Sequence, residues 1–324
     1  MTMSPTLDTS DPEDGTGTPG DSRARRGHGH PPTRRPKRRG GRTAYLYVLP
    51  ALILVVGVVY LGIGYNGWVS TLDWNGIDPN PESVGFDNYV KIFSDSIFWD
   101  SLSHVAIFGV IVILVQMALG LAMALIFSGP IFGRNIYKII VFVPVILSPA
   151  AVSIAFRQLL SPDGQVNEAL RFIGLDVLTN AWIADPKTAL IALAVINIWQ
   201  WTGFSFILYQ ASVSQIDQNL YEAAQIDGAG TWRIIRSIVI PQLKGTHATL
   251  ALTGVIGALK TFDIVFLVTG GGPGRSTEFL TTYIYKQAVQ QFNSGYAAAL
   301  AMVLLVLALT LTAFQMRAYR FGED

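Results

Sequence analysis

The chain has 324 residues, of which 51% are hydrophobic and 14% are charged, a balance too apolar for an ordinary soluble protein. Its formal net charge of +1 gives no field that would attract nucleic acid. The lack of cysteine excludes a disulfide framework and thiol chemistry, and the four histidines lack the HExxH spacing of a metal site. We therefore expect a membrane protein with no thiol catalysis, no metal site and no nucleic-acid partner.

Residues 1–43 differ in composition from the rest of the chain. They hold 14 charged side chains but only four hydrophobic ones, and Pro, Gly, Thr and Arg are frequent. Such a segment buries too little apolar area to offset the entropy of ordering, so we expect a disordered basic tail. Its basic run at 34–39 is either a determinant of membrane topology or a contact for anionic membrane lipid.

Six apolar stretches are long enough to cross a bilayer as helices, which takes about 20 residues each. They are residues 44–65, 105–127, 139–156, 188–210, 248–268 and 296–316. The first stretch has 22 residues and no small-residue cleavage site after it, so we expect it to be retained rather than removed as a signal peptide. The sequence thus predicts an all-α polytopic membrane domain over residues 44–324.

The distribution of Lys and Arg predicts the orientation of these helices. With the N-terminus in the cytoplasm, 16 Lys and Arg residues fall on the cytoplasmic side and six on the outside. Because Lys and Arg stay preferentially on the cytoplasmic side, this bias indicates that both termini are cytoplasmic.

A loop at about residues 214–245, between the fourth and fifth stretches, reads as two helices joined by a turn. Asn219 and Glu222 have the spacing of a capping box, and Ala223 and Ala224 add small residues to the first helix.

The second half of this loop carries its own signals. Gly228 and Gly230 supply the turn because glycine reaches positive φ without strain, and Thr231 is placed to cap the second helix. We expect that helix to end at Pro241.

Two motifs resemble a known family. Glu222-Ala223-Ala224, Asp227-Gly228-Ala229 and Ile240-Pro241 resemble the EAA loop of ABC importer permeases. The run Leu-Val-Thr-Gly-Gly-Gly-Pro at 267–273 resembles the carbohydrate-uptake subfamily, in its maltose-permease-F-like branch. The loop departs from many relatives at Asp217, where they have proline, and near Gly245, where they have a second proline.

This resemblance implies a type I importer permease, a non-catalytic bundle of six helices in the bacterial cytoplasmic membrane. It implies that the loop docks on a dimer of ABC ATPase subunits through Glu222, Ala223, Ala224, Asp227 and Gly228. Its other implied partners are a second homologous permease, an extracytoplasmic sugar-binding protein and a sugar substrate. No cofactor is expected on this chain, since ATP and Mg would bind the ATPase subunits. Without the resemblance, the loop reads equally well as an ordinary amphipathic segment in which Glu222 merely caps a helix.

The glycine-rich run at 270–277 superficially resembles a phosphate-binding loop. It lacks the lysine of GxxxxGK[ST], and Arg275 stands where GxGxxG requires its third glycine. We therefore expect an external turn, and an energy source on another subunit.

Polar residues inside the apolar stretches are candidates for a substrate path, because burying them in lipid is costly. The candidates are Asn197, Gln200, Trp201, Lys260 and Asp263. Amide groups pair with sugar hydroxyls and aromatic faces cover the C–H faces of sugar rings. Contacts between helices explain each polar residue equally well, and Lys260 and Asp263 have the spacing of an ion pair within one helix. Gln116 and Asn293 are weaker candidates.

The leading hypothesis is a permease that translocates a monosaccharide or oligosaccharide. The alternative is a self-sufficient proton-coupled secondary transporter with Lys260 and Asp263 as a proton relay. Secondary carriers commonly contain internal repeats, and we find none in this chain. These residues do not identify the sugar, and they do not distinguish a sugar from glycerol phosphate as the substrate.

Overall fold

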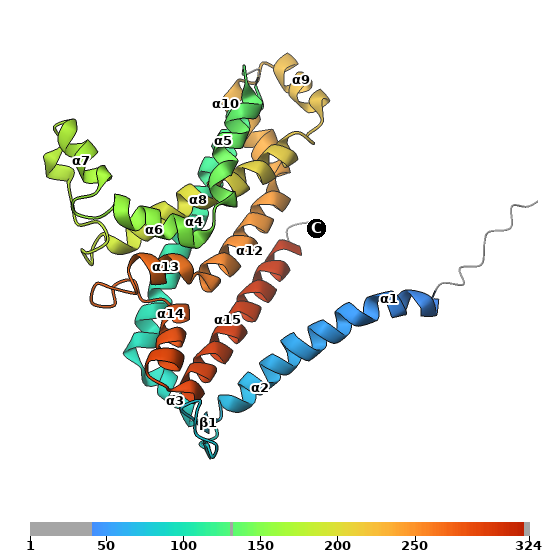
Figure 1. The fold of residues 1–324 in the computed structure, drawn as a ribbon. Helices are drawn as coiled ribbons and strands as arrows, with labels where there is room; N and C mark the ends of the chain where they lie inside the picture. Colours follow the sequence, from blue (N-terminus) through green and yellow to red (C-terminus); the bar gives the residue numbers. More distant parts are fainter. Residues whose placement is uncertain (1–40, 130–131, 321–324) are drawn as a thin grey trace, which may run out of the picture. The chain divides into compact units, whose positions relative to one another are not determined.

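The computed structural model describes residues 41–129 and 132–320 (Figure 1). The chain forms two units, residues 1–53 and 54–324. The described residues of the first unit belong to helix α1 (Gly41–Leu54), which begins three residues before the first predicted span. Residues 1–40 lie outside the described part, so disorder of the tail stays a prediction.

The second unit is mainly helical, and its described residues contain almost no strand. Its first half contains the π-helical η1 (Val55–Tyr60), α2 (Leu61–Val69), the antiparallel pair β1 (Leu72–Asp73) and β2 (Glu82–Ser83), α3 (Asp87–Ser94), α4 (Ser96–Ile126), α5 (Arg134–Ile146), α6 (Pro149–Leu159), α7 (Gln165–Phe172) and η2 (Asp176–Leu178). Its second half contains α8 (Ala189–Val213), α9 (Gln218–Ile226), α10 (Thr231–Ile234), η3 (Ile235–Val239), α11 (Ile240–Gln242), α12 (Lys244–Lys260), α13 (Asp263–Val268), α14 (Leu280–Tyr285), η4 (Lys286–Gln290) and α15 (Ser294–Arg320).

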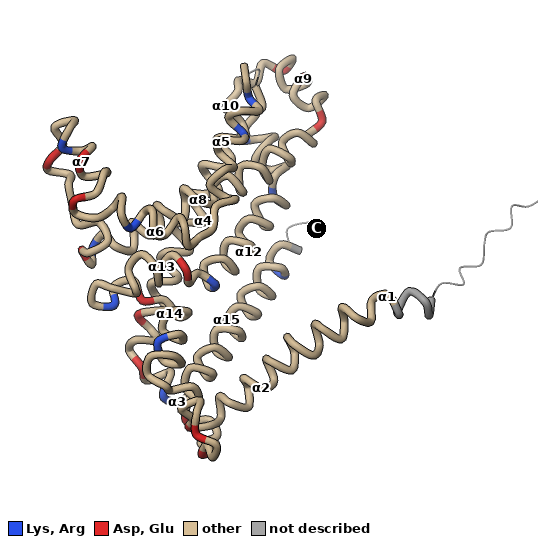
Figure 2. Tube along the Cα trace, viewed as in Figure 1, with Lys and Arg blue, Asp and Glu red and all other residues tan. Residues whose placement is uncertain are grey.

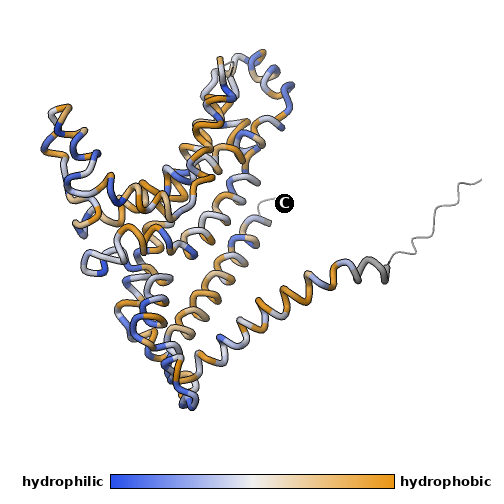
Figure 3. The backbone as a smooth tube through the Cα atoms, viewed as in Figure 1, coloured by the Kyte–Doolittle hydropathy of each residue, from blue (hydrophilic) through white to orange (hydrophobic). Residues whose placement is uncertain are grey.

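Four helices in the described part of the chain are long and apolar enough to cross a membrane. They are Tyr47–Val69, Ser96–Ile126, Ala189–Val213 and Ser294–Tyr319. They match the first, second, fourth and sixth predicted spans. Figure 3 shows hydrophobic residues along α2 and α15, with hydrophilic residues at α9 and near α3. The all-α membrane class is confirmed.

The third and fifth predicted spans are not continuous helices, which corrects the expectation of six unbroken ones. The third divides into α5 and α6, which meet at an angle of 96°. Pro149 opens α6, and a residue that precedes proline is pushed out of the helical region, so Ser148 has ψ 130°. The fifth divides into α12 and α13 at Thr261, whose ψ is 119°.

Small residues bring the central helices close together. α4 and α8 form the most extensive helix contact of the second unit. A Cβ on Gly120 of α4 would lie 2.8 Å from Ser205 Cβ, and a Cβ on Gly203 of α8 would lie 2.3 Å from the Val141 carbonyl of α5. Close backbone approach at small residues is typical of helix packing in membranes.

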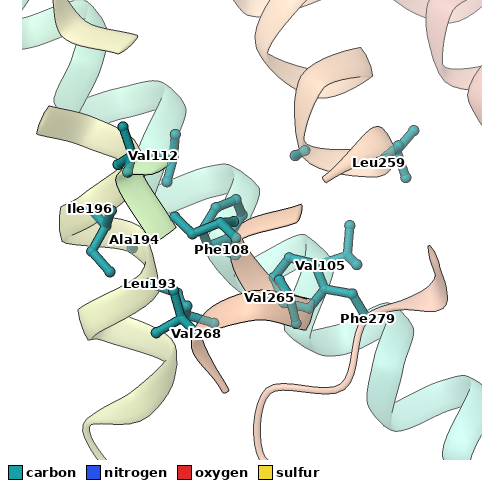
Figure 4. Packing of buried hydrophobic residues seen from close by; sticks show 13 residues of the cluster. Val105, Phe108, Val112, Leu193, Ala194, Ile196, Leu259, Val265, Val268 and Phe279 are labelled. Carbon is teal, nitrogen blue, oxygen red and sulfur yellow. The ribbon is translucent and has the colours of Figure 1, made fainter. Parts of the chain in front are cut away.

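A core cluster at the centre of the second unit includes side chains from α4, α8, α12 and α13 (Figure 4). Within it, the rings of Phe108 and Phe279 meet edge to face with centroids 5.1 Å apart. This cluster holds α13 beside α4 and α8, and so places both helix breaks next to α8.

Candidate functional sites

The first candidate site is the turn between α9 and α10. α9 begins after Asp217, whose side chain accepts a hydrogen bond of 3.0 Å from the Asn219 amide. Asp217 is therefore the N-cap, and the predicted capping box of Asn219 and Glu222 is wrong. An aspartate two residues earlier satisfies the free backbone amide, because Asp serves as N-cap as well as Asn does.

The turn itself depends on one glycine. Gly228 has φ +74°, whereas Gly230 has φ −68° and ψ 161°, a conformation open to any residue. Hydrogen bonds from the Gly228 amide to the Gln225 carbonyl and from the Ala229 amide to the Ala224 carbonyl close the end of α9. These two bonds form a Schellman motif, in which glycine takes the left-handed position. The prediction is right for Gly228 and wrong for Gly230.

The second helix of the loop also differs from expectation. Gly230 is the N-cap of α10, and Thr231 is the first helical residue. The helix does not end before Pro241 but includes it in α11, which ends at Gln242. The π-helical turn η3 lies just before Pro241. Its wider turn accommodates the proline ring, which would clash with a preceding carbonyl in an α-helix.

Four of the five predicted docking residues are exposed on this turn: Glu222, Ala223, Asp227 and Gly228. The fifth, Ala224, is half-buried and packs on the apolar cluster beneath α9. Glu222 forms no ion pair with any residue that the structure describes. Figure 2 shows acidic residues on α9 and basic residues on the side of α10.

Exposed apolar side chains flank the same turn. Ile226 is 87% exposed and Trp232 is 71% exposed. Tyr221, a residue of α9, is half-buried, and burial raises the pKa of its hydroxyl, which keeps it neutral. Exposed apolar and aromatic side chains of this kind are typical of a protein-docking surface, and the exposed Glu222 carboxylate beside them is available to a basic group of a partner.

The second candidate site is an open cavity of about 430 Å³ between α4, α6, α8, α12 and α13. All five residues predicted for the substrate path line it: Asn197, Gln200, Trp201, Lys260 and Asp263. Gln116 lines it as well, whereas Asn293 does not. The apolar stretches that hold these residues are separate in sequence, and the fold brings them together.

Two of these residues also connect helices. The Gln116 side-chain amide donates to the Asn197 side-chain and backbone oxygens, both at 3.1 Å. The Gln200 amide, on a side chain only 2% exposed, donates to the Leu147 carbonyl at 3.2 Å. Leu147 follows the last residue of α5, so Gln200 satisfies a carbonyl at the first helix break. The predicted place on a substrate path and the contact between helices thus fall on the same side chains.

Lys260 and Asp263 lie on opposite sides of the second helix break. They form no ion pair with each other, so their interpretation as a pair within one helix is wrong. Lys260 ends α12 and Asp263 begins α13, which suits the partial charges of helix ends. Both side chains are exposed to the cavity. The two residues of the break, Thr261 and Phe262, line the cavity as well.

The sequence reasoning missed several lining residues. Ser205, Thr253 and Thr261 add hydroxyl groups to the lining. Gly254 and Gly257 of α12 also line the cavity and have no side chain. A signal was present, because hydroxyl and glycine residues recur at helical spacing along α12. The cavity therefore offers amide, hydroxyl, ammonium, carboxylate and indole groups to a polar ligand.

Comparisons with known proteins find a matching family and several similar chains. Residues 116–319 match the model of the family described as "Binding-protein-dependent transport system inner membrane component". The chain is 33% identical to the probable ABC transporter permease protein YurN of Bacillus subtilis, over 86% of this chain and 97% of that protein. It is 31% identical to the lactose transport system permease protein LacF of Rhizobium radiobacter, over 85% of this chain and 93% of that protein. Its fold matches a chain of the bacterial alginate ABC transporter in complex with an alginate pentasaccharide-bound periplasmic protein, with a TM-score of 0.74 and 26% identity over 85% of this chain and 92% of that one.

Proposed function

The chain belongs to the family of binding-protein-dependent transport system inner membrane components, and from that premise we propose that it is the permease subunit of an ATP-driven importer that translocates a sugar. Transport in this family depends on a binding protein, so the alternative of a self-sufficient proton-coupled transporter is wrong. The observation that carries the substrate class is the meeting of all five candidate residues on one open cavity.

The chemistry of the cavity suits a monosaccharide or an oligosaccharide. Amides such as Asn197 both donate to and accept from hydroxyl groups, and the Trp201 ring offers a face for the C–H groups of a sugar ring. Lys260 and Asp263 add charges with no described partner, which are free to hydrogen-bond a polyol. LacF and the alginate transporter, two of the similar proteins, are named for saccharides, which supports the same class.

ATP would act through the turn between α9 and α10. The exposed Glu222 carboxylate is available to a basic residue of an ATPase subunit, and Ala223 and Gly228 permit close approach. Closure of a dimer of ABC ATPase subunits would then be passed to the membrane helices through the rigid turn. ATP and Mg would bind those subunits, so this chain itself needs no cofactor and is non-catalytic.

The remaining partners follow from the family. We propose a second homologous permease beside this chain and an extracytoplasmic sugar-binding protein that delivers the substrate. The chain would lie in the bacterial cytoplasmic membrane with both termini in the cytoplasm, as the Lys and Arg distribution indicates.

The test is reconstitution of the complete complex in vesicles with its binding protein. A panel of unlabelled monosaccharides, disaccharides and oligosaccharides is screened for stimulation of ATPase activity and for uptake. We expect at least one sugar to stimulate both, and uptake to persist with an uncoupler at constant ATP. Stimulation by amino acids or inorganic ions but by no sugar would contradict the proposed substrate class.

A further inference from the structure

We propose that Thr281 is a positioning residue of the substrate cavity, and that the buried Glu278 and its half-buried partner Lys286 hold it in place. Thr281 would set the helix break that presents Lys260 and Asp263 to the substrate. The inference rests on the proposed sugar transport and adds to it the element that fixes the shape of the cavity.

The break leaves backbone groups without helical partners. α12 ends at Lys260, and Thr261 is extended, so the Thr261 carbonyl has no partner in its own helix. The Thr281 hydroxyl donates to this carbonyl at 2.5 Å. A carbonyl in a membrane segment that lacks such a partner costs free energy, so this bond favours the broken conformation over others.

Thr281 lies in the first turn of α14, and that turn is fixed on both sides. Phe279, the N-cap of α14, is fully buried and contacts Phe108 of α4. Thr282 accepts a hydrogen bond of 3.0 Å from the Phe279 amide. Figure 4 shows Phe279 and Phe108 in the same cluster as Val265 of α13. The Thr281 hydroxyl therefore has a defined position relative to α13.

Glu278 anchors the same turn from the loop that joins α13 and α14. Its carboxylate is 2% exposed and accepts hydrogen bonds from Lys286 Nζ and, at 2.7 Å, from the Thr282 hydroxyl. His104 Nδ1 lies 3.1 Å from the Glu278 backbone carbonyl, to which it donates. A buried carboxylate with an ammonium and a hydroxyl partner is strongly held, because loss of the ammonium leaves a buried charge unpaired and loss of the hydroxyl leaves a buried acceptor without a hydrogen bond.

The glycine-rich motif packs directly on this ion pair. Gly271 has φ +87°, and a Cβ there would lie 2.8 Å from both Glu278 Oε2 and Lys286 Nζ. The glycine-rich run lacks the residues of a phosphate-binding loop, but Gly271 allows it to pack closely over Glu278 and Lys286. The loop, the first turn of α14 and the Thr261 carbonyl form one connected unit that ends at the cavity.

The test compares variants of Thr281 in the complete complex. Thr281→Val removes the hydroxyl at nearly constant volume, and Thr281→Ser keeps it. Thr310→Val is the matched control, since the Thr310 hydroxyl also donates to a helix carbonyl, at 2.7 Å, but lies on the exposed part of α15 away from the cavity. If Thr281→Val assembles poorly, Thr281→Ala removes the same donor and needs less space.

Two measurements are made on each variant. Uptake gives the apparent KM and kcat for the best sugar, and hydrogen exchange without sugar follows peptides that cover Thr261. For Thr281→Val we expect a KM raised roughly fivefold to tenfold, the equivalent of about one lost hydrogen bond, with kcat little changed. We also expect faster exchange at the break, with Thr281→Ser and Thr310→Val like the unchanged chain.

Two results would overturn the proposal. One is unchanged KM and exchange in Thr281→Val; the other is a loss of complex and of thermal stability that accounts for all of the lost uptake. Failure of the unchanged complex to transport any sugar would instead contradict the proposed function. Exchange at the break would still decide the role of Thr281, because that measurement needs no substrate.

Discussion

The side-chain amide of Gln200 donates to the backbone carbonyl of Leu147 at 3.2 Å, so a residue of α8 completes the end of α5. Non-helical backbone inside a membrane persists where neighbouring groups satisfy it or where it faces a cavity. The break between α5 and α6 meets both conditions. Gln200 satisfies the Leu147 carbonyl, and Pro149, which opens the next helix, lines the cavity.

We predict that Gln200→Leu lowers the stability of the complex by about 1–3 kcal/mol, because the Leu147 carbonyl then lacks a partner. Thermal unfolding of the purified complex measures this. The matched control is Gln210→Leu on the same helix, where the side-chain amide makes only a 3.4 Å contact with Ser128. Equal stability of the two variants would show that Gln200 serves the substrate alone.

The two helix breaks show how far the sequence determines this fold. The apolar runs predicted four spans correctly, because length and lack of charge suffice for a continuous helix. The break before Pro149 had a local signal that hydropathy alone does not register. The break at Thr261 has neither Gly nor Pro, and its carbonyl partner, Thr281, lies 20 residues away. Such tertiary pairing is not visible in a local pattern.

We predict that Gly228→Val abolishes association with the ATPase and uptake while the chain still inserts in the membrane. At φ +74° a β-branched residue is strained by about 1–2 kcal/mol, and relief of that strain would reshape the turn. Co-purification with the ATPase is the measurement. Gly228→Asn, which tolerates the left-handed region, and Gly230→Ser, at an ordinary φ, should both retain association. Association retained by Gly228→Val would contradict a docking role for this turn.

We predict that Glu222→Lys also removes ATPase association but leaves the folded chain as stable as before. Glu222 is exposed and has no described ion-pair partner, so its replacement breaks no contact within this chain. At an interface, the reversed charge would lose its partner and meet like charge, which typically costs several kcal/mol. Pull-down of the ATPase and thermal unfolding of the isolated permease are compared. Normal association would refute the docking proposal at this residue.

We predict that acid weakens the contacts around Asp95, the N-cap of α4. Burial by itself raises the pKa of this carboxyl, but hydrogen bonds from Tyr283, Tyr296 and the Ile97 and Phe98 amides outweigh it and lower the pKa below its usual 3.8. Because the folded-state pKa is the lower one, the ionised carboxylate stabilises the fold above the unfolded-state pKa, and this contribution disappears as pH falls through the folded-state value.

Asp95→Asn tests this linkage through the pH dependence of thermal unfolding. The variant lacks the carboxylate, so its Tm should be lower than that of the unchanged chain near neutral pH and the two should converge in acid. Asp100→Asn, at an exposed position with no ion pair to a described residue, is the control. Parallel pH curves for Asp95→Asn and the unchanged chain would show that the carboxylate charge has no role.

The last prediction separates the two charges at the second break from the structural amide of Gln200. Lys260 and Asp263 are exposed to the cavity and unpaired within the described residues, so neither stabilises the fold through an ion pair. Asp263→Asn and Lys260→Met should therefore change stability by no more than about 0.5 kcal/mol. A hydrogen bond from a charged group to a sugar hydroxyl contributes about 1.5–3 kcal/mol, so the affinity for the best sugar should fall roughly 10- to 100-fold. Competition by the sugar panel should change rank as well, because a site that loses a polar group penalises ligands unequally. An unchanged competition profile together with reduced assembly would place both charges in the structure of the break and not in contact with the substrate.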